Sequence, residues 1–239
     1  MARQRFDQKY YRRFYKTDPV HTEAQIHPLV LALDSLAKWW GYPIRSVLET
    51  GAGLGLWRNW YRSHRQKVRV LSTDQSEYAC RTYGHEQRDL SRWFARRPFD
   101  LVVCQSVLQY LSDADAASAI RNLGLSTRHF LYFEVPTLED YRETLDKKST
   151  DLRIHLRSAA WYRRRLSQDF TEVGASIWLK KTAPVILYEL ERTKAGKPKP
   201  PAKRSPPKAA SKGRGSRGSP RTSPSRKSGA AESRSPALT

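Results

Sequence analysis

The chain has 239 residues, and 38% of them are hydrophobic, which is enough apolar material for one good-sized core. The formal net charge is +21, but residues 194–239 alone carry 13 Lys/Arg against one acid, so +12 of that charge belongs to the C-terminal end. Two cysteines without close spacing argue against a disulfide-stapled secreted domain, and no apolar run reaches the ~18 residues of a membrane span; we expect a reduced, cytoplasmic protein.

Residues 1–41 are predicted to form a helical cap. Aromatic residues recur there at the i, i+4, i+8 spacing of one helical face: Phe6, Tyr10 and Phe14. A second helix is predicted to open at the pair His27–Pro28, because proline suits a first helical turn, and to stop at Gly41. The aromatic first helix either packs on the core or closes as a lid over a bound ligand.

The strand predicted from Arg45 to Glu49 runs into a glycine-rich turn. Glycine follows at alternate positions, with one alanine between the first two: Gly51, Ala52, Gly53 and Gly55. Glycine tolerates positive φ and has no Cβ, so such a turn can press its amides against a ligand before the helix predicted over 54–64 begins. The spacing is Gly-x-Gly-x-Gly, whereas dinucleotide-binding folds use Gly-x-Gly-x-x-Gly.

Glu49 stands two residues before the first glycine, and the pattern Glu-x-Gly-x-Gly-x-Gly resembles the first motif of the class I S-adenosyl-L-methionine-dependent methyltransferases. The resemblance implies that the loop amides and Glu49 hold the methionine part of S-adenosyl-L-methionine. A glycine-rich turn without a ligand is the alternative, so the motifs that follow are the test.

The next predicted strand, from Val68 to Asp74, ends in an acid 23 residues after Gly51. Neighbouring parallel strands end at one edge of a sheet, so Asp74 is placed to accept hydrogen bonds from both hydroxyls of a ribose, with Gln75 beside it. An N-cap for the helix that follows Ser76 is the alternative, and it does not exclude ribose binding.

The short polar segment 86–90 resembles the family segment that contacts adenine. The resemblance implies that Asp89 accepts the adenine amino hydrogens and that the backbone amide of Leu90 meets the ring. A surface-loop aspartate is the alternative reading of this residue.

The apolar run from Phe99 to Leu111 predicts a central parallel strand that is covered on both faces. Its ending resembles the fourth motif of small-molecule methyltransferases, which implies that Gln105 and Ser106 lie at the cofactor rim. The acceptor is then expected near three tyrosines: Tyr11, Tyr15 and Tyr110. No Asn/Asp-Pro-Pro-Tyr stands here and neither cysteine follows a proline, so the usual signatures of base methylation are missing.

A helix is predicted over 113–125, followed by a strand over 129–135 with Glu134 near its carboxyl end. Glu134 is a candidate base or substrate contact, or a salt-bridged rim acid. The region 138–168 is predicted to be helical and rich in arginine, which either receives an anionic acceptor or is solvated. His155 is its candidate for proton transfer.

Two strands, 170–179 and 183–190, are predicted to close the sheet as an antiparallel hairpin. The expected fold is therefore a doubly wound, Rossmann-like α/β domain over 42–193, with seven strands and an antiparallel final strand. Residues 194–239, rich in Pro, Ser, Lys and Arg, are predicted to be disordered. This tail either contacts nucleic acid nonspecifically or only solubilises the protein.

The predicted function is the transfer of a methyl group from S-adenosyl-L-methionine to a small-molecule acceptor. No metal site is expected, because histidines and acids never occur at ligand spacing. Two alternatives remain open: an RNA or ribosome-associated methyltransferase, and a noncatalytic nucleic-acid-binding adaptor with the same fold.

Overall fold

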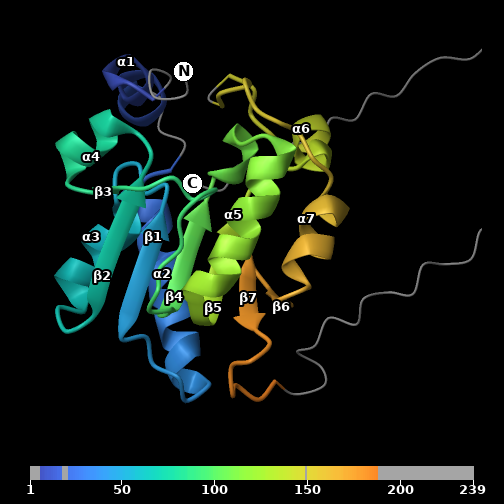
Figure 1. The fold of residues 1–239 in the computed structure, drawn as a ribbon. Coiled ribbons are helices and arrows are strands. Elements are labelled where there is room, and N and C mark those ends of the chain that lie inside the picture. The colour runs from blue at the N-terminus through green and yellow to red at the C-terminus, as the bar shows by residue number, and fades with distance from the viewer. Residues whose placement is uncertain (1–5, 18–20, 149, 188–239) are drawn as a thin grey trace, which may run out of the picture. The chain divides into compact units, whose positions relative to one another are not determined.

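The structure, a computed structural model, describes residues 6–17, 21–148 and 150–187. One sheet runs through this part of the chain, with its strands in the order β3-β2-β1-β4-β5-β7-β6 (Figure 1). The strands are β1 (Ser46–Thr50), β2 (Arg69–Asp74), β3 (Glu86–Gln87), β4 (Phe99–Gln105), β5 (Thr127–Glu134), β6 (Phe170–Gly174) and β7 (Ile177–Lys180).

The first five strands in chain order pair in parallel, and β7 is inserted antiparallel between β5 and β6. The strand order reverses at β1, because β2 lies on one side of it and β4 on the other. Open α/β sheets bind their ligands at such a reversal, outside the carboxyl ends of the strands. The predicted seven-stranded doubly wound sheet with an antiparallel insertion is confirmed.

Helices cover both faces of the sheet (Figure 1). Apolar residues of α2 and α3 pack on one face, and those of α5 and α7 pack on the other. The helical elements are α1 (Gln8–Tyr11), η2 (Arg12–Thr17), α2 (Glu23–Trp39), α3 (Leu56–His64), α4 (Glu77–Tyr83), η3 (Leu108–Tyr110), α5 (Asp113–Ser126), α6 (Leu138–Glu143) and α7 (Ala159–Leu166).

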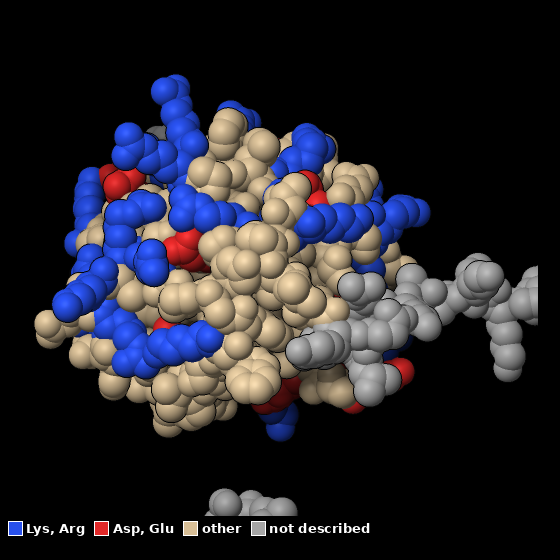
Figure 2. Space-filling model, turned by 90° about the horizontal axis from the view of Figure 1, so that it is seen from below, with Lys and Arg blue, Asp and Glu red and all other residues tan. Residues whose placement is uncertain are grey.

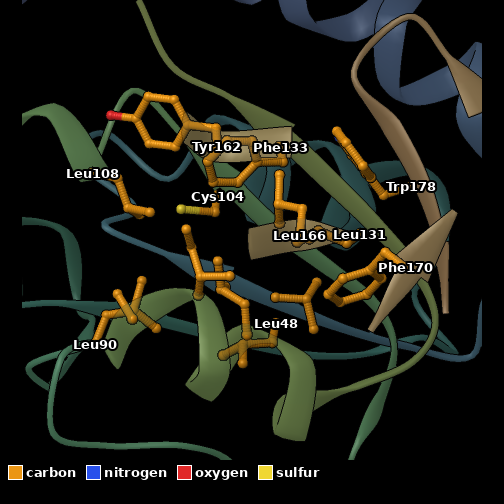
Figure 3. Close-up of a cluster of buried hydrophobic side chains, with 14 of the residues drawn as sticks. Leu48, Leu90, Cys104, Leu108, Leu131, Phe133, Tyr162, Leu166, Phe170 and Trp178 are labelled. Atoms are coloured by element: carbon orange, nitrogen blue, oxygen red, sulfur yellow. The ribbon is translucent and has the colours of Figure 1, made fainter. Parts of the chain in front are cut away.

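The central strands are buried on both faces, as their continuous apolar sequences predict. Every residue of β1 is buried, and so are the first six of the seven residues of β4. On the α5 and α7 side, Leu48 and Cys104 meet Leu166 and Phe170 in one apolar cluster (Figure 3). Burial raises the pKa of the Cys104 thiol to about 12, so this cysteine is a core residue and not a nucleophile.

Helix α2 begins earlier than predicted. Its N-terminus is closed by a capping box in which Thr22 and Gln25 bond each other's backbone N–H groups, so the helix opens at Glu23 and Pro28 lies inside it. The predicted stop is confirmed: Gly41 follows the C-cap with φ of +81°, and its N–H donates to Lys38 O at 2.9 Å.

The closing hairpin differs from the prediction. Residues 170–179 do not form one strand, because the chain reverses between β6 and β7 through three residues with positive φ: Gly174, Ala175 and Ser176. Residues 183–187, predicted to begin the second strand, belong to no strand of the described chain, and 188–190 lie outside the described residues.

The region 138–168 is not continuously helical, since α6 ends at Glu143 and α7 starts at Ala159. Ser158 caps α7 by accepting from Trp161 N–H, which fixes that start. No helix in the described ranges has the length and apolar character that crossing a bilayer requires. The predicted tail, 194–239, lies outside the described residues.

Candidate active site

The glycine turn lies at the reversal of strand order, directly after β1. Gly51, Gly53 and Gly55 all have positive φ, between +55° and +73°. A Cβ on Gly51 would stand 2.4 Å from the Val107 side chain, which reaches over from the end of β4, so position 51 admits only glycine. The turn therefore brings backbone close to the carboxyl ends of β1 and β4, where the strand order reverses.

Glu49 closes the N-terminus of α3 from below. Its two carboxylate oxygens accept from Trp57 N–H (3.2 Å) and Arg58 N–H (3.0 Å), a role that the N-cap Gly55 cannot fill without a side chain. Burial of this carboxyl, which is 4% exposed, raises its pKa to about 7 despite these donors.

Asp74 ends β2 with a buried carboxylate turned toward the glycine turn. Its Oδ2 accepts from Gly53 N–H at 3.0 Å and its Oδ1 from Ser76 N–H at 2.8 Å, and burial raises its pKa. Each oxygen keeps a second lone pair, so the carboxylate can still accept from ligand hydroxyls. Ser76, rather than Asp74, caps helix α4 by accepting from Ala79 N–H.

The predicted adenine segment follows β3 at the same edge. Asp89 Oδ1 accepts from both Ser91 N–H and Ser91 Oγ, which shapes a tight turn. The Leu90 side chain is buried in the core cluster of Figure 3, and its carbonyl accepts from Asn122. Gln75, beside Asp74, offers its carbonyl to the side chain of Gln87.

The N-terminal segment covers the glycine turn. Tyr15 lies over Gly53, where an added Cβ would be 3.4 Å from the tyrosine hydroxyl, and Tyr11 stacks on Tyr15 with ring centroids 5.1 Å apart. The space left over the turn is about 40 Å³. A nucleoside needs several times that volume, so these tyrosines occupy the space in which a cofactor would bind.

The covering side chains belong to one short segment and not to the sheet. Phe6, Tyr10, Tyr11 and Phe14 form an aromatic cluster with Ala79 of α4, separate from the two main cores. The donor and acceptor groups on the sheet edge suit a nucleoside cofactor, and a displacement of residues 6–17 would open the space above them.

A second cavity of about 310 Å³ adjoins the first and shares Tyr15, His21 and Ser106 with it. Ser106 has φ of +55°, a strained conformation for a residue with a side chain. The walls contain Tyr110 and, from the described chain, no lysine or arginine; the acids among them are Glu134, Asp140, Asp146 and Asp151. Of the three predicted acceptor contacts, Tyr15 and Tyr110 line this cavity, whereas Tyr11 packs against Tyr78.

Glu134 connects the two cavities through a chain of hydrogen bonds. Trp57 Nε1–H donates to Gln105 Oε1 (2.9 Å), and Gln105 Nε2–H donates to Glu134 Oε2 (3.1 Å). Tyr132 O–H donates to the same carboxylate oxygen at 2.7 Å. Gln105 is therefore a positioning residue between the glycine turn and Glu134, and the second oxygen of Glu134 faces the cavity.

That second oxygen lies 3.5 Å from Nε2 of His21, a residue that the sequence analysis missed. This buried ring nitrogen has no other partner among the described residues. His21 directly precedes the capping box of α2, which holds it at the junction of the two cavities. No spacing in the sequence links it to Glu134.

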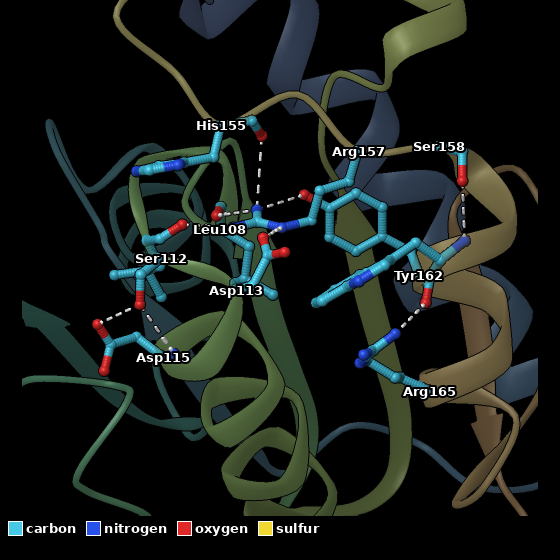
Figure 4. A network of polar contacts seen from close by, with 11 residues as sticks. Leu108, Ser112, Asp113, Asp115, His155, Arg157, Ser158, Tyr162 and Arg165 are labelled. Atoms are coloured by element: carbon cyan, nitrogen blue, oxygen red, sulfur yellow. Dashed lines mark hydrogen bonds and ion pairs between the residues drawn. The ribbon is translucent and has the colours of Figure 1, made fainter.

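His155 lies elsewhere: its side chain is exposed, and it is not among the residues that line either cavity. Its carbonyl and its neighbour Arg157 belong to a structural network (Figure 4). Arg157 is buried and donates to Asp113, to three backbone carbonyls and to the hydroxyl oxygen of Tyr162. Arg157 therefore supports the loops beside the cavity, and no arginine of the described chain lines it.

No family profile matches the sequence, and no curated protein matches it either. Solved structures do match the fold. The N-methyltransferase NodS from Bradyrhizobium japonicum WM9, in complex with S-adenosyl-L-homocysteine, is 19% identical over 73% of this chain and 97% of its own, with a TM-score of 0.52. The magnesium protoporphyrin IX methyltransferase ChlM from Synechocystis PCC 6803, with bound S-adenosyl-L-homocysteine, is 18% identical over 75% and 98%, with a TM-score of 0.50. The PH0226 protein from Pyrococcus horikoshii OT3 is 15% identical over 72% and 97%, with a TM-score of 0.53.

The chain has the class I methyltransferase fold.

In that fold, the methyltransferase motifs expected from the sequence occupy one edge of the sheet. Asp74, Gln105 and Glu134 are the last residues of β2, β4 and β5, and Glu49 is the last but one of β1, so the structure brings them together at the carboxyl ends of the strands. No group of three or more metal-ligating side chains occurs in the described part of the chain.

Proposed function

We propose that this protein transfers the methyl group of S-adenosyl-L-methionine to a small-molecule acceptor. The observation that carries the proposal is the meeting of two cavities at Ser106: one over the glycine turn and one beside Glu134. A methyl transfer needs donor and acceptor held in line, and adjoining cavities with shared walls provide that arrangement. NodS and ChlM, which share the fold, are described with bound S-adenosyl-L-homocysteine, and this supports the cofactor class.

The bound cofactor supplies an electrophilic methyl group on a positively charged sulfur. In this proposal the chain's residues bind and orient it: the glycine turn and Glu49 hold the methionine part, and Asp74 and Gln75 hold the ribose. Asp89 and the Leu90 amide meet the adenine, while Gln105 and Ser106 line the rim. Glu134 is the proposed proton acceptor, and His21 takes the place beside it for which the sequence analysis offered His155.

The test is calorimetric titration of the full chain with S-adenosyl-L-homocysteine. We expect the wild type to bind S-adenosyl-L-homocysteine and Asp74→Ala to bind it at least about 100-fold more weakly. The reason is that both ribose hydroxyls lose their acceptor in a buried site. Asp100→Asn is the matched control: Asp100 is as buried as Asp74 but lies at the opposite edge of the sheet, so its affinity should stay within about twofold. A wild type that does not bind S-adenosyl-L-homocysteine would end the proposal.

A second candidate function is nonspecific binding of nucleic acid, and one observation favours it. Seen from below, the molecule carries many lysines and arginines (Figure 2). They flank the amino ends of the strands and the ends of α2 and α3: Lys38, Arg45, Arg65, Lys67, Arg69, Arg96, Arg97 and Arg128. This face is opposite the glycine turn, so it would tether a polyanion rather than deliver it as an acceptor.

Fluorescence anisotropy with a single-stranded RNA oligomer, over ~50–200 mM salt, tests this second candidate. Replacing Arg96 and Arg97 with serine should reduce the salt slope by about two contacts, since both side chains are exposed and each would neutralise one phosphate. Deleting residues 194–239 separates the contribution of the tail. If neither the serine replacements nor the deletion lowers the affinity for RNA, nucleic-acid binding is excluded as a function of these regions.

A further inference from the structure

The cavity beside Glu134 has the opposite charge to the protein that contains it. The chain carries 44 Lys/Arg and a formal net charge of +21, yet the described walls of this cavity contain four carboxylates and neither lysine nor arginine. We propose, resting on the proposed function, that the acceptor is an organic cation: a primary or secondary amine on an aromatic or apolar body, bound in its protonated form.

Two of the carboxylates are held by neutral donors. Glu134 Oε2 accepts from Gln105 and Tyr132, and Asp140 accepts from the backbone and hydroxyl of Thr137 in the capping box of α6. Neutral donors fix a carboxylate in place without cancelling its charge. A cation that enters the cavity meets those charges in partly desolvated surroundings, where they act more strongly than in bulk water.

A third carboxylate, Asp151, is buried and has a cation beside it. Arg153 Nε lies 3.4 Å from Asp151 Oδ1, but the Arg153 side chain is 71% exposed and does not line this cavity. This pair lowers the cavity's negative charge without reversing it. The nearby Arg157 and Arg165 are engaged with Asp113 and with the Trp161 ring, so they do not compensate the wall.

Four aromatic side chains also line this cavity, three of them from the N-terminal segment: Tyr10, Phe14, Tyr15 and Tyr110. The faces of such rings attract cations, and their edges bury the apolar body of a ligand. An anionic acceptor would lose its hydration and meet like charges here. The wall therefore discriminates by charge as well as by shape.

The charge of the wall does not depend on the N-terminal segment. Glu134 ends β5 and Asp140 belongs to α6, so neither carboxylate lies on the segment 6–17 that a cofactor would displace. His21 is not part of that segment either: it directly precedes Thr22, the N-cap of α2, and is held in place by that helix.

A protonated amine has no lone pair for reaction, so the site must also remove a proton. His21 and Glu134 face each other across 3.5 Å at the junction of the cavities, and this pair takes the proton as the ammonium becomes a neutral amine. Binding as a cation and reaction as a neutral amine thus use the same two residues.

The test measures the binding of matched probes to the full chain, with and without S-adenosyl-L-homocysteine. It does not depend on catalytic turnover. Two sets of near-isosteres are compared by saturation-transfer NMR and titration: tyramine, tyrosol and 4-hydroxyphenylacetate, then tryptamine, tryptophol and indole-3-acetate. We expect each amine to bind at least about tenfold more tightly than its alcohol, and each carboxylate to bind more weakly than either. Alcohols or carboxylates that match the amines would overturn the proposal, and so would an absence of amine binding in both conditions.

Variants that remove one carboxylate charge test whether the preference for amines comes from the cavity wall. Glu134→Gln and Asp140→Asn should each weaken tyramine about tenfold and leave tyrosol unchanged, because each removes one charge and keeps the shape of the wall. Glu143→Gln is the control: it removes an exposed charge from α6, the helix of Asp140, outside the cavity wall, and should change neither probe. Equal weakening of tyramine and tyrosol would show a loss of shape and contradict the proposal. S-adenosyl-L-homocysteine binding reports on the cofactor site separately, so the two proposals can fail independently.

Discussion

The two ends of the parallel strands, called here the carboxyl edge and the amino edge of the sheet, hold their buried acids in different ways. At the carboxyl edge, Glu49 and Asp74 accept hydrogen bonds from backbone N–H groups of the glycine turn and of α3. At the amino edge, Asp100 accepts from Arg45 N–H and Ser46 Oγ and also pairs with the guanidinium of Arg128 at 2.7 Å. Among these three acids of the described chain, only Asp100 forms an ion pair with a cationic side chain.

Helix direction explains much of this difference. In a doubly wound fold the helices that follow parallel strands run back against them, so their N-termini lie at the carboxyl edge, where the macrodipole favours negative charge. Acids fall in first turns and cations in last turns accordingly, as in α2 with Glu23 and Lys38 and in α5 with Asp113. A basic amino edge is thus partly a consequence of the fold, and nucleic-acid binding there needs its own measurement.

The largest expected effect is at the amino edge. Asp100→Ala should lower the free energy of unfolding by about 3 kcal/mol, because Arg45 N–H and the buried Ser46 hydroxyl lose their acceptor and Arg128 loses its partner. Urea denaturation measures it. Glu143→Ala is the control: it removes an exposed acid, and its free energy of unfolding should stay within about 0.5 kcal/mol of wild type. Asp115 would not serve, because its carboxylate accepts from Ser112 at the N-terminus of α5. Equal losses in both variants would mean that Asp100 does not organise this edge.

The next effect is a pH dependence at the carboxyl edge. The pKa of Glu49 is raised from 4.5 to about 7, so the folded state holds this proton more tightly than the unfolded state does. The stabilisation is complete below pH 4.5 and is lost as the pH rises to about 7, and it amounts to about 3 kcal/mol. Glu49→Gln keeps an oxygen acceptor for α3 but cannot titrate.

The measurement is the difference in urea unfolding free energy between wild type and Glu49→Gln at several values of pH from 4.5 to 8. Wild type should lose stability relative to the variant as the pH rises, since other titrating groups cancel in the difference. A difference that does not change with pH would show that Glu49 is ionised across this range. The backbone donors would then outweigh burial at this edge.

The sequence predicts the carboxyl edge well because its signals are local. Asp74, Gln105 and Glu134 each end a predicted strand, and parallel strands that end together bring such residues to one edge without any knowledge of side-chain contacts. The pairing of Gln105 with Glu134 follows from the register of β4 and β5. The positions of these residues could therefore be predicted from strand direction alone.

Other features depend on contacts between distant residues, and the sequence does not reveal them. His21 reaches Glu134 across 113 positions only because α2 packs on the sheet. The reversal at Gly174–Ser176 was missed because alanine and serine rarely take positive φ, so they give no turn signal. In the region 144–158, helical composition was overridden by loop contacts such as those of Arg157.

The smallest expected effect concerns the cover over the carboxyl edge. Tyr15 lies on Gly53 in the space that a cofactor needs, so binding must first displace it, and the apparent affinity is reduced by the fraction of molecules in which the space is closed. Tyr15→Ala should therefore bind S-adenosyl-L-homocysteine about tenfold more tightly, a gain of about 1.4 kcal/mol. Calorimetric titration measures the change.

Tyr78→Ala is the matched control, because Tyr78 packs on Tyr11 in the same aromatic cluster but does not line the space over the glycine turn. It should leave the affinity within about twofold while costing similar stability. If Tyr15→Ala instead weakens binding, the tyrosine contacts the bound cofactor as a closed lid, which is the other outcome expected from the aromatic N-terminal sequence. The sign of one change in affinity thus decides whether this segment competes with the ligand or completes its site.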